Sequence, residues 1–167
     1  KCRAMPIGNV SGSEIPPMMP DGMATVMGMT PIENAIHIRE VGLRDGLQSL
    51  PRTLPTADKL DWIRDAHGAG LREIEVGSFV PARLLPQLAD TAEVLAHARS
   101  LPGLIASVLV PNLKGAERAI ECGSHSMLLP LSASHAHSLA NLKRTPDEVV
   151  ADLARIAPTP LSVMLLG

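Results

Sequence analysis

The sequence is poor in aromatic residues and in cysteine. It has one tryptophan, one phenylalanine and no tyrosine in 167 residues, so a buried core has to be built from aliphatic side chains. The two cysteines, Cys2 and Cys122, lie in unrelated contexts, and neither has the paired spacing of a zinc ligand set. The sequence therefore gives no support to a cysteine-ligated zinc domain.

Strong charge and long apolar runs are also missing. The formal net charge is −2, without the basic excess that follows a phosphate backbone, so we expect no nucleic-acid partner. No apolar run approaches the ~20 residues needed to span a bilayer, and residues 1–29 lack the continuous apolar centre of a signal peptide. With 46% hydrophobic and 19% charged residues, the chain is expected to be a globular cytoplasmic protein with no membrane partner.

Residues 1–35 differ in composition from the rest of the chain. They hold six of the eight methionines, together with glycine, proline and serine, and show no hydrophobic period. A segment of this kind offers no regular apolar face to a core. We expect residues 1–35 to be a disordered or loosely ordered leader and residues 36–167 to form the domain.

From residue 36 onward, short apolar runs alternate with amphipathic segments. The apolar runs begin near residues 36, 72, 104, 126 and 161. Thr56, Asn112 and Thr145 are the expected N-caps of three of the intervening helices, the last in a capping box with Glu148. The alternation predicts an α/β fold with a parallel sheet. A doubly wound five-stranded sheet and a (β/α)₈ barrel, which needs ~250 residues when complete, both begin in this way.

Polar side chains gather where the predicted strands end, which is where parallel α/β proteins place their active sites. Arg44, Asp45 and Gln48 follow the first strand, and Glu75 lies among apolar residues in the second. Taken alone, Arg44 and Asp45 also fit a solvated turn. A buried carboxylate normally needs a partner, however, so we expect Glu75 to pair with Arg44 on the neighbouring strand.

The residues after the fourth strand read "SASHAHSLAN". On an extended segment, His135 and His137 would point the same way and could bind a divalent metal, although no third ligand is near in sequence. The alternative interpretation is that either histidine simply lines the mouth of a pocket.

Four blocks, "EVGLRDGLQ", "IEVGSFV", "LPQLADTAEVL" and "VPNLKGAERAIECG", resemble in this order the 3-hydroxy-3-methylglutaryl-CoA lyase family. The resemblance covers residue 36 to the end. It implies a (β/α)₈ TIM barrel of the lyase type, of which about the first five strands are present. It also implies cleavage of a carbon–carbon bond in a 3-hydroxyacyl-CoA to give acetyl-CoA and acetoacetate, a reaction of leucine degradation and ketone-body formation.

The resemblance assigns roles to the polar residues already found. Asp45 is expected to bind a divalent metal, Mg²⁺ or Mn²⁺, and Arg44 to stabilise negative charge on the thioester oxygen. Glu75 would orient Arg44. Three further residues are expected to line the pocket for the acyl-CoA substrate, namely Gln48, Ser134 and Asn141.

The family takes further metal ligands from a His-x-His at the end of strand six and an asparagine on a later strand, and its catalytic cysteine lies further on still. The sequence shows none of these. We therefore expect an N-terminal portion of a lyase with little or no turnover alone, whose open sheet edge favours a homo-oligomer. Two alternatives remain. One is a related acyl-CoA lyase or aldol-type condensing enzyme, and the other is a non-catalytic half-barrel interaction module.

Overall fold

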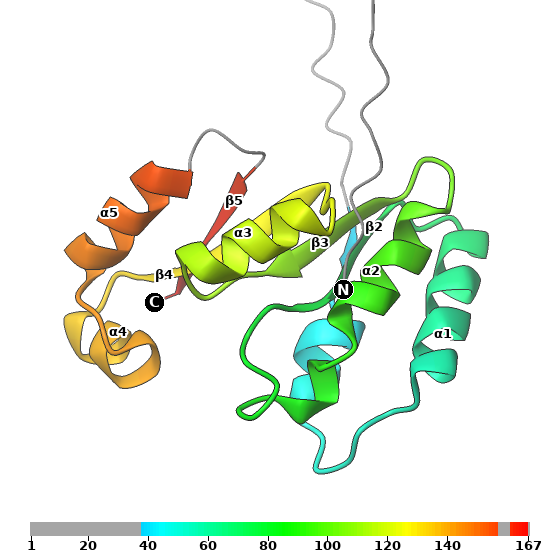
Figure 1. Cartoon of the computed structure of the whole chain (residues 1–167), viewed down its shortest axis with the longest axis horizontal. Helices are drawn as coiled ribbons and strands as arrows, with labels where there is room; N and C mark the ends of the chain where they lie inside the picture. The colour runs from blue at the N-terminus through cyan, green and yellow to red at the C-terminus, as the bar shows by residue number, and fades with distance from the viewer. Residues whose placement is uncertain (1–37, 157–160, 167) are drawn as a thin grey trace, which may run out of the picture. The chain divides into compact units, whose positions relative to one another are not determined.

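A computed structural model describes residues 38–156 and 161–166 (Figure 1). Its sheet has five strands in the order β1-β2-β3-β4-β5, and every neighbouring pair is parallel. The strands are β1 (Arg39–Glu40), β2 (Glu73–Ser78), β3 (Ile105–Leu109), β4 (Ser126–Ser132) and β5 (Leu161–Leu166).

The strand order decides between the two architectures that the sequence left open. A doubly wound sheet reverses its order at a switch point, whereas the strands of a barrel follow one another around the sheet in chain order. Each strand here lies beside the next one in sequence. The fold is therefore that of a partial TIM barrel, as predicted. The predicted leader, residues 1–35, lies outside the described residues, and the domain boundary stays a prediction.

Helices connect the strands. The α-helices are α1 (Thr56–Gly68), α2 (Thr91–Arg99), α3 (Leu113–Glu121), α4 (His135–Leu142) and α5 (Pro146–Ile156), and two short turns are the π-helical η1 (Gly42–Gly46) and the 3₁₀-helical η2 (Pro86–Leu88). α2 packs on β2 and β3, and α1 packs on α2 (Figure 1). No helix in these two described ranges is long and apolar enough to cross a membrane.

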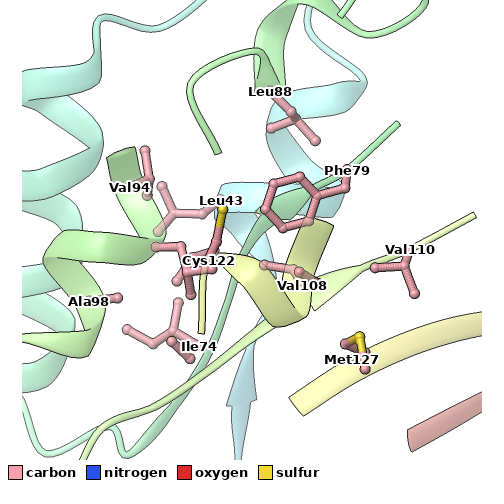
Figure 2. Packing of buried hydrophobic residues seen from close by; sticks show 14 of the residues in the cluster. Leu43, Ile74, Phe79, Leu88, Val94, Ala98, Val108, Val110, Cys122 and Met127 are labelled. Atoms are coloured by element: carbon pink, nitrogen blue, oxygen red, sulfur yellow. The ribbon is translucent and has the colours of Figure 1, made fainter. Parts of the chain in front are cut away.

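The core is aliphatic, as the shortage of aromatic residues requires. Ile74 and Val108 of the sheet are fully buried, as are Val94 and Ala98 of α2. Phe79, which is 6% exposed, adds an aromatic ring at one side of this cluster (Figure 2). Burial of such side chains contributes about 1.5–3 kcal/mol each, so the layer between β2, β3 and α2 is a rigid base for residues at the strand ends.

The helix starts confirm two of the three predicted caps. Asn112 accepts a hydrogen bond from the Gly115 backbone N–H at 3.0 Å. Thr145 and Glu148 form the expected reciprocal capping box, with backbone-to-side-chain distances of 2.8 and 3.3 Å. The prediction for Thr56 was wrong, because it is the first residue of α1 and its hydroxyl donates to Asp90 instead of capping the helix.

The segment after β4 also differs from the extended form considered for its histidines. It is helical as α4, because the Ser134 hydroxyl caps the helix and residues such as Ala136 and Leu139 favour it. Successive helical positions are rotated by about 100°, so His135 and His137 point in different directions. They do not form a two-histidine metal site.

Candidate active site

Arg44 and Asp45 lie in η1, the turn that follows β1. The backbone N–H groups of Arg44 and Asp45 both donate to the Val41 carbonyl, at 3.1 and 2.7 Å. This tight turn buries Leu43 completely and Arg44 to 7% exposure, while the Asp45 side chain remains 57% exposed. The two consecutive charged side chains therefore differ in burial: the Arg44 guanidinium lies inside the protein and the Asp45 carboxylate faces solvent. They are not a solvated turn.

The guanidinium of Arg44 binds Glu75 of β2 in a two-point ion pair. Arg44 Nε donates to Glu75 Oε1 at 2.5 Å, and Nη2 donates to Oε2 at 3.3 Å. Glu75 is 1% exposed, so its charge is held away from water and is balanced by Arg44. The structure confirms the predicted pairing of the two residues.

Arg44 keeps hydrogen-bonding capacity beyond this pair. Its Nη1 donates to Asp45 Oδ1 at 2.8 Å. A guanidinium has five N–H groups, and these three hydrogen bonds use one on each nitrogen. Among the described residues, one N–H on Nη1 and one on Nη2 therefore remain without an acceptor. Both belong to a fixed, always charged group, which suits an oxygen that gains negative charge during a reaction.

Asp45 and Gln48 complete the cluster around Arg44. Gln48 Nε2 donates to Asp45 Oδ1 at 2.8 Å, so that oxygen accepts from both Gln48 and Arg44. Within the described ranges, the second carboxylate oxygen, Oδ2, accepts no hydrogen bond. The structure thus brings together four of the six predicted site residues, three from the segment that follows β1 and one from the middle of β2.

This donor set fits a divalent metal only in part. An exposed carboxylate with one oxygen that accepts no hydrogen bond is a suitable ligand for Mg²⁺ or Mn²⁺. Asp45 provides such a group. In the part of the chain that the structure describes, no three His, Cys, Asp or Glu residues come together around a common point. Asp45 is therefore a single ligand, and a bound ion would take its remaining ligands from elsewhere.

Among the described residues, Ser134 and Asn141 form no hydrogen bond with this cluster. Ser134 is the N-cap of α4 and Asn141 lies on that helix, which follows β4. Ser134 caps α4 by accepting from the His137 backbone N–H at 3.3 Å. The Asn141 amide contacts His137 Nε2 at 2.6 Å, and His137 Nδ1 contacts the buried Ser132 hydroxyl at 2.8 Å. Both residues follow the carboxyl end of β4, the edge expected from the sequence. The side-chain hydrogen bonds of Ser134 and Asn141 are both with His137 of the same helix.

Three other polar residues near Glu75 were not predicted from the sequence. Arg39 of β1 binds Glu73 of β2 at 2.6 Å, and Ser107 of β3, fully buried, lies opposite Glu75 in the sheet register. Arg39 and Glu73 are separated by 34 positions in the chain, so only the strand register reveals their contact. The polar row along β2 therefore extends beyond the predicted pair.

Comparison with known proteins identifies the family of this chain. Residues 35–159 match the family model described as HMGL-like. The chain belongs to the HMGL-like family. It is 44% identical over 107 residues to a 3-hydroxy-3-isohexenylglutaryl-CoA/hydroxymethylglutaryl-CoA lyase of Pseudomonas aeruginosa, a match over 64% of this chain and 36% of that protein. It is 35% identical over 126 residues to a hydroxymethylglutaryl-CoA lyase of Bacillus subtilis, covering 75% of this chain and 42% of the relative.

Solved structures agree with this assignment. An HMG-CoA lyase from Acinetobacter baumannii, in complex with coenzyme A and 3-methylmalate, superimposes with a TM-score of 0.74 at 36% identity, over 82% of this chain and 47% of that one. The HMG-CoA lyase of Bacillus subtilis gives a TM-score of 0.72 at 33% identity, over 78% and 46% of the two chains. The chain thus spans less than half the length of these relatives.

Proposed function

We propose that this chain carries the first part of the active site of a 3-hydroxy-3-methylglutaryl-CoA lyase. The observation that carries the proposal is the buried Arg44–Glu75 pair with Asp45 beside it, in a chain of the HMGL-like family. Related lyases act on such thioesters according to their names, which supports an acyl-CoA substrate here.

The reaction breaks the bond between C2 and C3 of the substrate. The C3 hydroxyl loses its proton, its oxygen becomes the ketone of acetoacetate, and the electron pair of the broken bond moves to the thioester enolate, which is then protonated to acetyl-CoA. The free N–H groups of Arg44 would donate to the thioester oxygen as it gains charge. Glu75 holds the guanidinium in one orientation, so little reorganisation is needed during the reaction.

A divalent metal fits this scheme through Asp45. A metal bound there would polarise substrate oxygens and make the hydroxyl proton easier to remove. Asp45 is kept in place by Arg44 Nη1 and Gln48 Nε2, both on Oδ1, so Oδ2 is oriented for such a ligand role. Gln48, Ser134 and Asn141 stay as proposed lining residues of the acyl-CoA pocket. A cytoplasmic location, leucine degradation and ketone-body formation stay predictions.

The test is a chimera in which residues 35–159 replace the matching segment of the Pseudomonas aeruginosa lyase. We expect release of acetyl-CoA from 3-hydroxy-3-methylglutaryl-CoA in the presence of Mg²⁺ or Mn²⁺. Arg44→Ala should reduce kcat by about 10²–10³-fold, as loss of an oxyanion donor does. A folded chimera that binds coenzyme A but cleaves no 3-hydroxyacyl-CoA would refute the proposal. Preference for another 3-hydroxyacyl-CoA would favour the related lyase activity.

A second proposal is association through the sheet edge. β1 pairs with β2 on one side and has no strand on its other side within the described residues, and Ile38 beside it is 66% exposed. An exposed edge with apolar side chains favours pairing with another chain. Sedimentation velocity should show concentration-dependent dimers that Ile38→Lys weakens, and a monomer at all concentrations would contradict association.

A further inference from the structure

An irregularity in β2 directly follows Glu75, the residue that binds Arg44. The strand register with β3 runs from Glu75 opposite Ser107 to Gly77 opposite Val108, so one extra residue, Val76, is inserted in β2. A β-bulge of this kind changes which face of the sheet the following side chains point to.

The faces of β2 show that change. Ile74 is fully buried and lies in the cluster that contains Val94 and Ala98 of α2 (Figure 2). Glu75, its neighbour in the strand, therefore points to the opposite face, where it meets Arg44. Without the bulge, residue 77 would share the face of Glu75. Instead, the Cβ position of Gly77 is directed at α2, so the insertion reverses the order of faces just after Glu75.

Thr91, the first residue of α2, occupies the space that the missing side chain of Gly77 leaves. A Cβ added at Gly77 would overlap Thr91 Oγ1 and lie 2.8 Å from its Cγ2. The Thr91 side chain therefore lies directly against the backbone of the bulge. Any residue larger than glycine at position 77 would have to displace the Thr91 side chain.

The hydroxyl of Thr91 also completes the backbone hydrogen bonding of the bulge. The Ser78 backbone N–H donates to Thr91 Oγ1 at 3.1 Å, and the hydroxyl is within 2.7 Å of the Leu88 carbonyl and 3.1 Å of the Ser78 carbonyl, its two possible acceptors. Thr91 is 3% exposed. A buried side chain thus supplies a partner that no neighbouring strand provides, because β1 pairs only with Glu73 and Ile74.

Thr91 is in turn fixed by the residue before it. Asp90 accepts from Lys59 Nζ at 2.6 Å and from the Thr56 hydroxyl at 2.8 Å, and Lys59 is 2% exposed. The start of α2 is therefore tied to α1 by an ion pair that is buried on the Lys59 side. The contacts of Asp90 with α1 therefore fix the position of Thr91 relative to the bulge, and these contacts do not include Arg44.

We infer that Thr91, seated on Gly77, is a positioning residue for the Arg44–Glu75 pair: it holds the bulged backbone that directly follows Glu75, and so fixes the position from which Glu75 reaches Arg44. The inference rests on the proposed function, since the catalytic role of Arg44 is what makes this orientation matter. Thr91 acts through the backbone at positions 76–78 and does not touch the reacting atoms.

The test uses the chain itself and needs no turnover. The Nε–H of Arg44 donates to Glu75 at 2.5 Å in a buried pair, so its NMR resonance should be shifted downfield and should exchange slowly with water. Arg44→Lys identifies the resonance by removing it. Thr91→Val keeps the shape of the side chain but loses the hydroxyl, and Gly77→Ala keeps the hydroxyl but displaces it.

Both variants should speed exchange of the Arg44 Nε–H about 10-fold or more, since a hydrogen bond to a charged group is weakened. Thr91→Ser should stay within about threefold of the parent, because its hydroxyl keeps the Ser78 bond. Val94→Ala is the matched control: it creates a cavity one turn along α2, lowers the melting temperature and should leave the resonance unchanged.

Unchanged exchange in a folded Thr91→Val or Gly77→Ala would overturn the inference. Equally fast exchange of the Arg44 Nε–H in Val94→Ala would also overturn the inference, because the effect would then come from general destabilisation of the fold. If Thr91→Val does not fold, Gly77→Ala against Val94→Ala decides the matter. An inactive chimera with a protected Arg44 Nε–H would refute the proposed lyase function alone, and the positioning role would still be decided by the variants.

Discussion

Arg44 and Glu75, separated by 31 positions in the chain, meet in a buried ion pair in which Nε and Nη2 contact the two carboxylate oxygens at 2.5 and 3.3 Å. The pair joins the turn after β1 to the middle of β2. It fixes the direction of the two remaining N–H groups of Arg44, which are the groups that the proposed function assigns to the substrate.

Arg44→Ala should destabilise the chain by about 3–5 kcal/mol, because it leaves the Glu75 carboxylate buried without its cation. Urea unfolding measures the loss. Arg39→Ala is the control, since it breaks another Arg–Glu pair to β2, one whose side chains are 30% and 21% exposed, and it should cost below about 1 kcal/mol. Equal losses of unfolding free energy in the two variants would show that the greater burial of the Arg44–Glu75 pair does not affect stability.

Asp45→Asn should leave the stability of the chain within about 0.5 kcal/mol, because the side chain is 57% exposed. In the chimera described above, it should weaken Mn²⁺ binding by at least about 10-fold, as measured by electron paramagnetic resonance of the free ion. Asp58→Asn, an exposed change on α1, is the control and should keep the parent affinity. Full Mn²⁺ binding by Asp45→Asn would remove Asp45 from the proposed ligands.

Lys59→Met should cost about 2–3 kcal/mol of folding stability. Its Nζ donates to Asp90 and to the Gln87 carbonyl at 2.6 and 2.7 Å, and methionine leaves both acceptors without this partner. Asp90→Asn in the same chain should recover part of the loss, because it removes the unpaired charge. Additive losses in thermal unfolding of the two single variants and the double variant would show that the two residues do not interact.

Asn112→Ala should destabilise the chain by about 1 kcal/mol through loss of the α3 cap. Asn112→Asp retains an oxygen acceptor and should stay close to the parent in thermal unfolding. Because the cap explains Asn112 fully, neither change should alter kcat of the chimera by more than about twofold. A large loss of turnover with normal stability would instead assign Asn112 to the active site.

The sequence predicted the Arg44–Glu75 contact for a reason that holds generally: a carboxylate inside an apolar strand needs a cation, and Arg44 stood at the end of the neighbouring strand. It could not predict the sequential strand order, since doubly wound and barrel folds share the same βα alternation. The helix at His135–Leu142 was missed because a serine-rich segment after a strand also fits a loop. The contact between Thr91 and Gly77 depends on a bulge, and no residue pattern marks it.

The strand order has a consequence for how the sheet is built during synthesis. Arg39 pairs with Glu73, and each later strand pairs with the one made before it. Every new strand therefore finds its partner already present, a short distance back along the chain, and the sheet can grow by addition at one edge. A ribosome-bound chain could then assemble β1 to β5 in the order in which they emerge, without waiting for a distant segment.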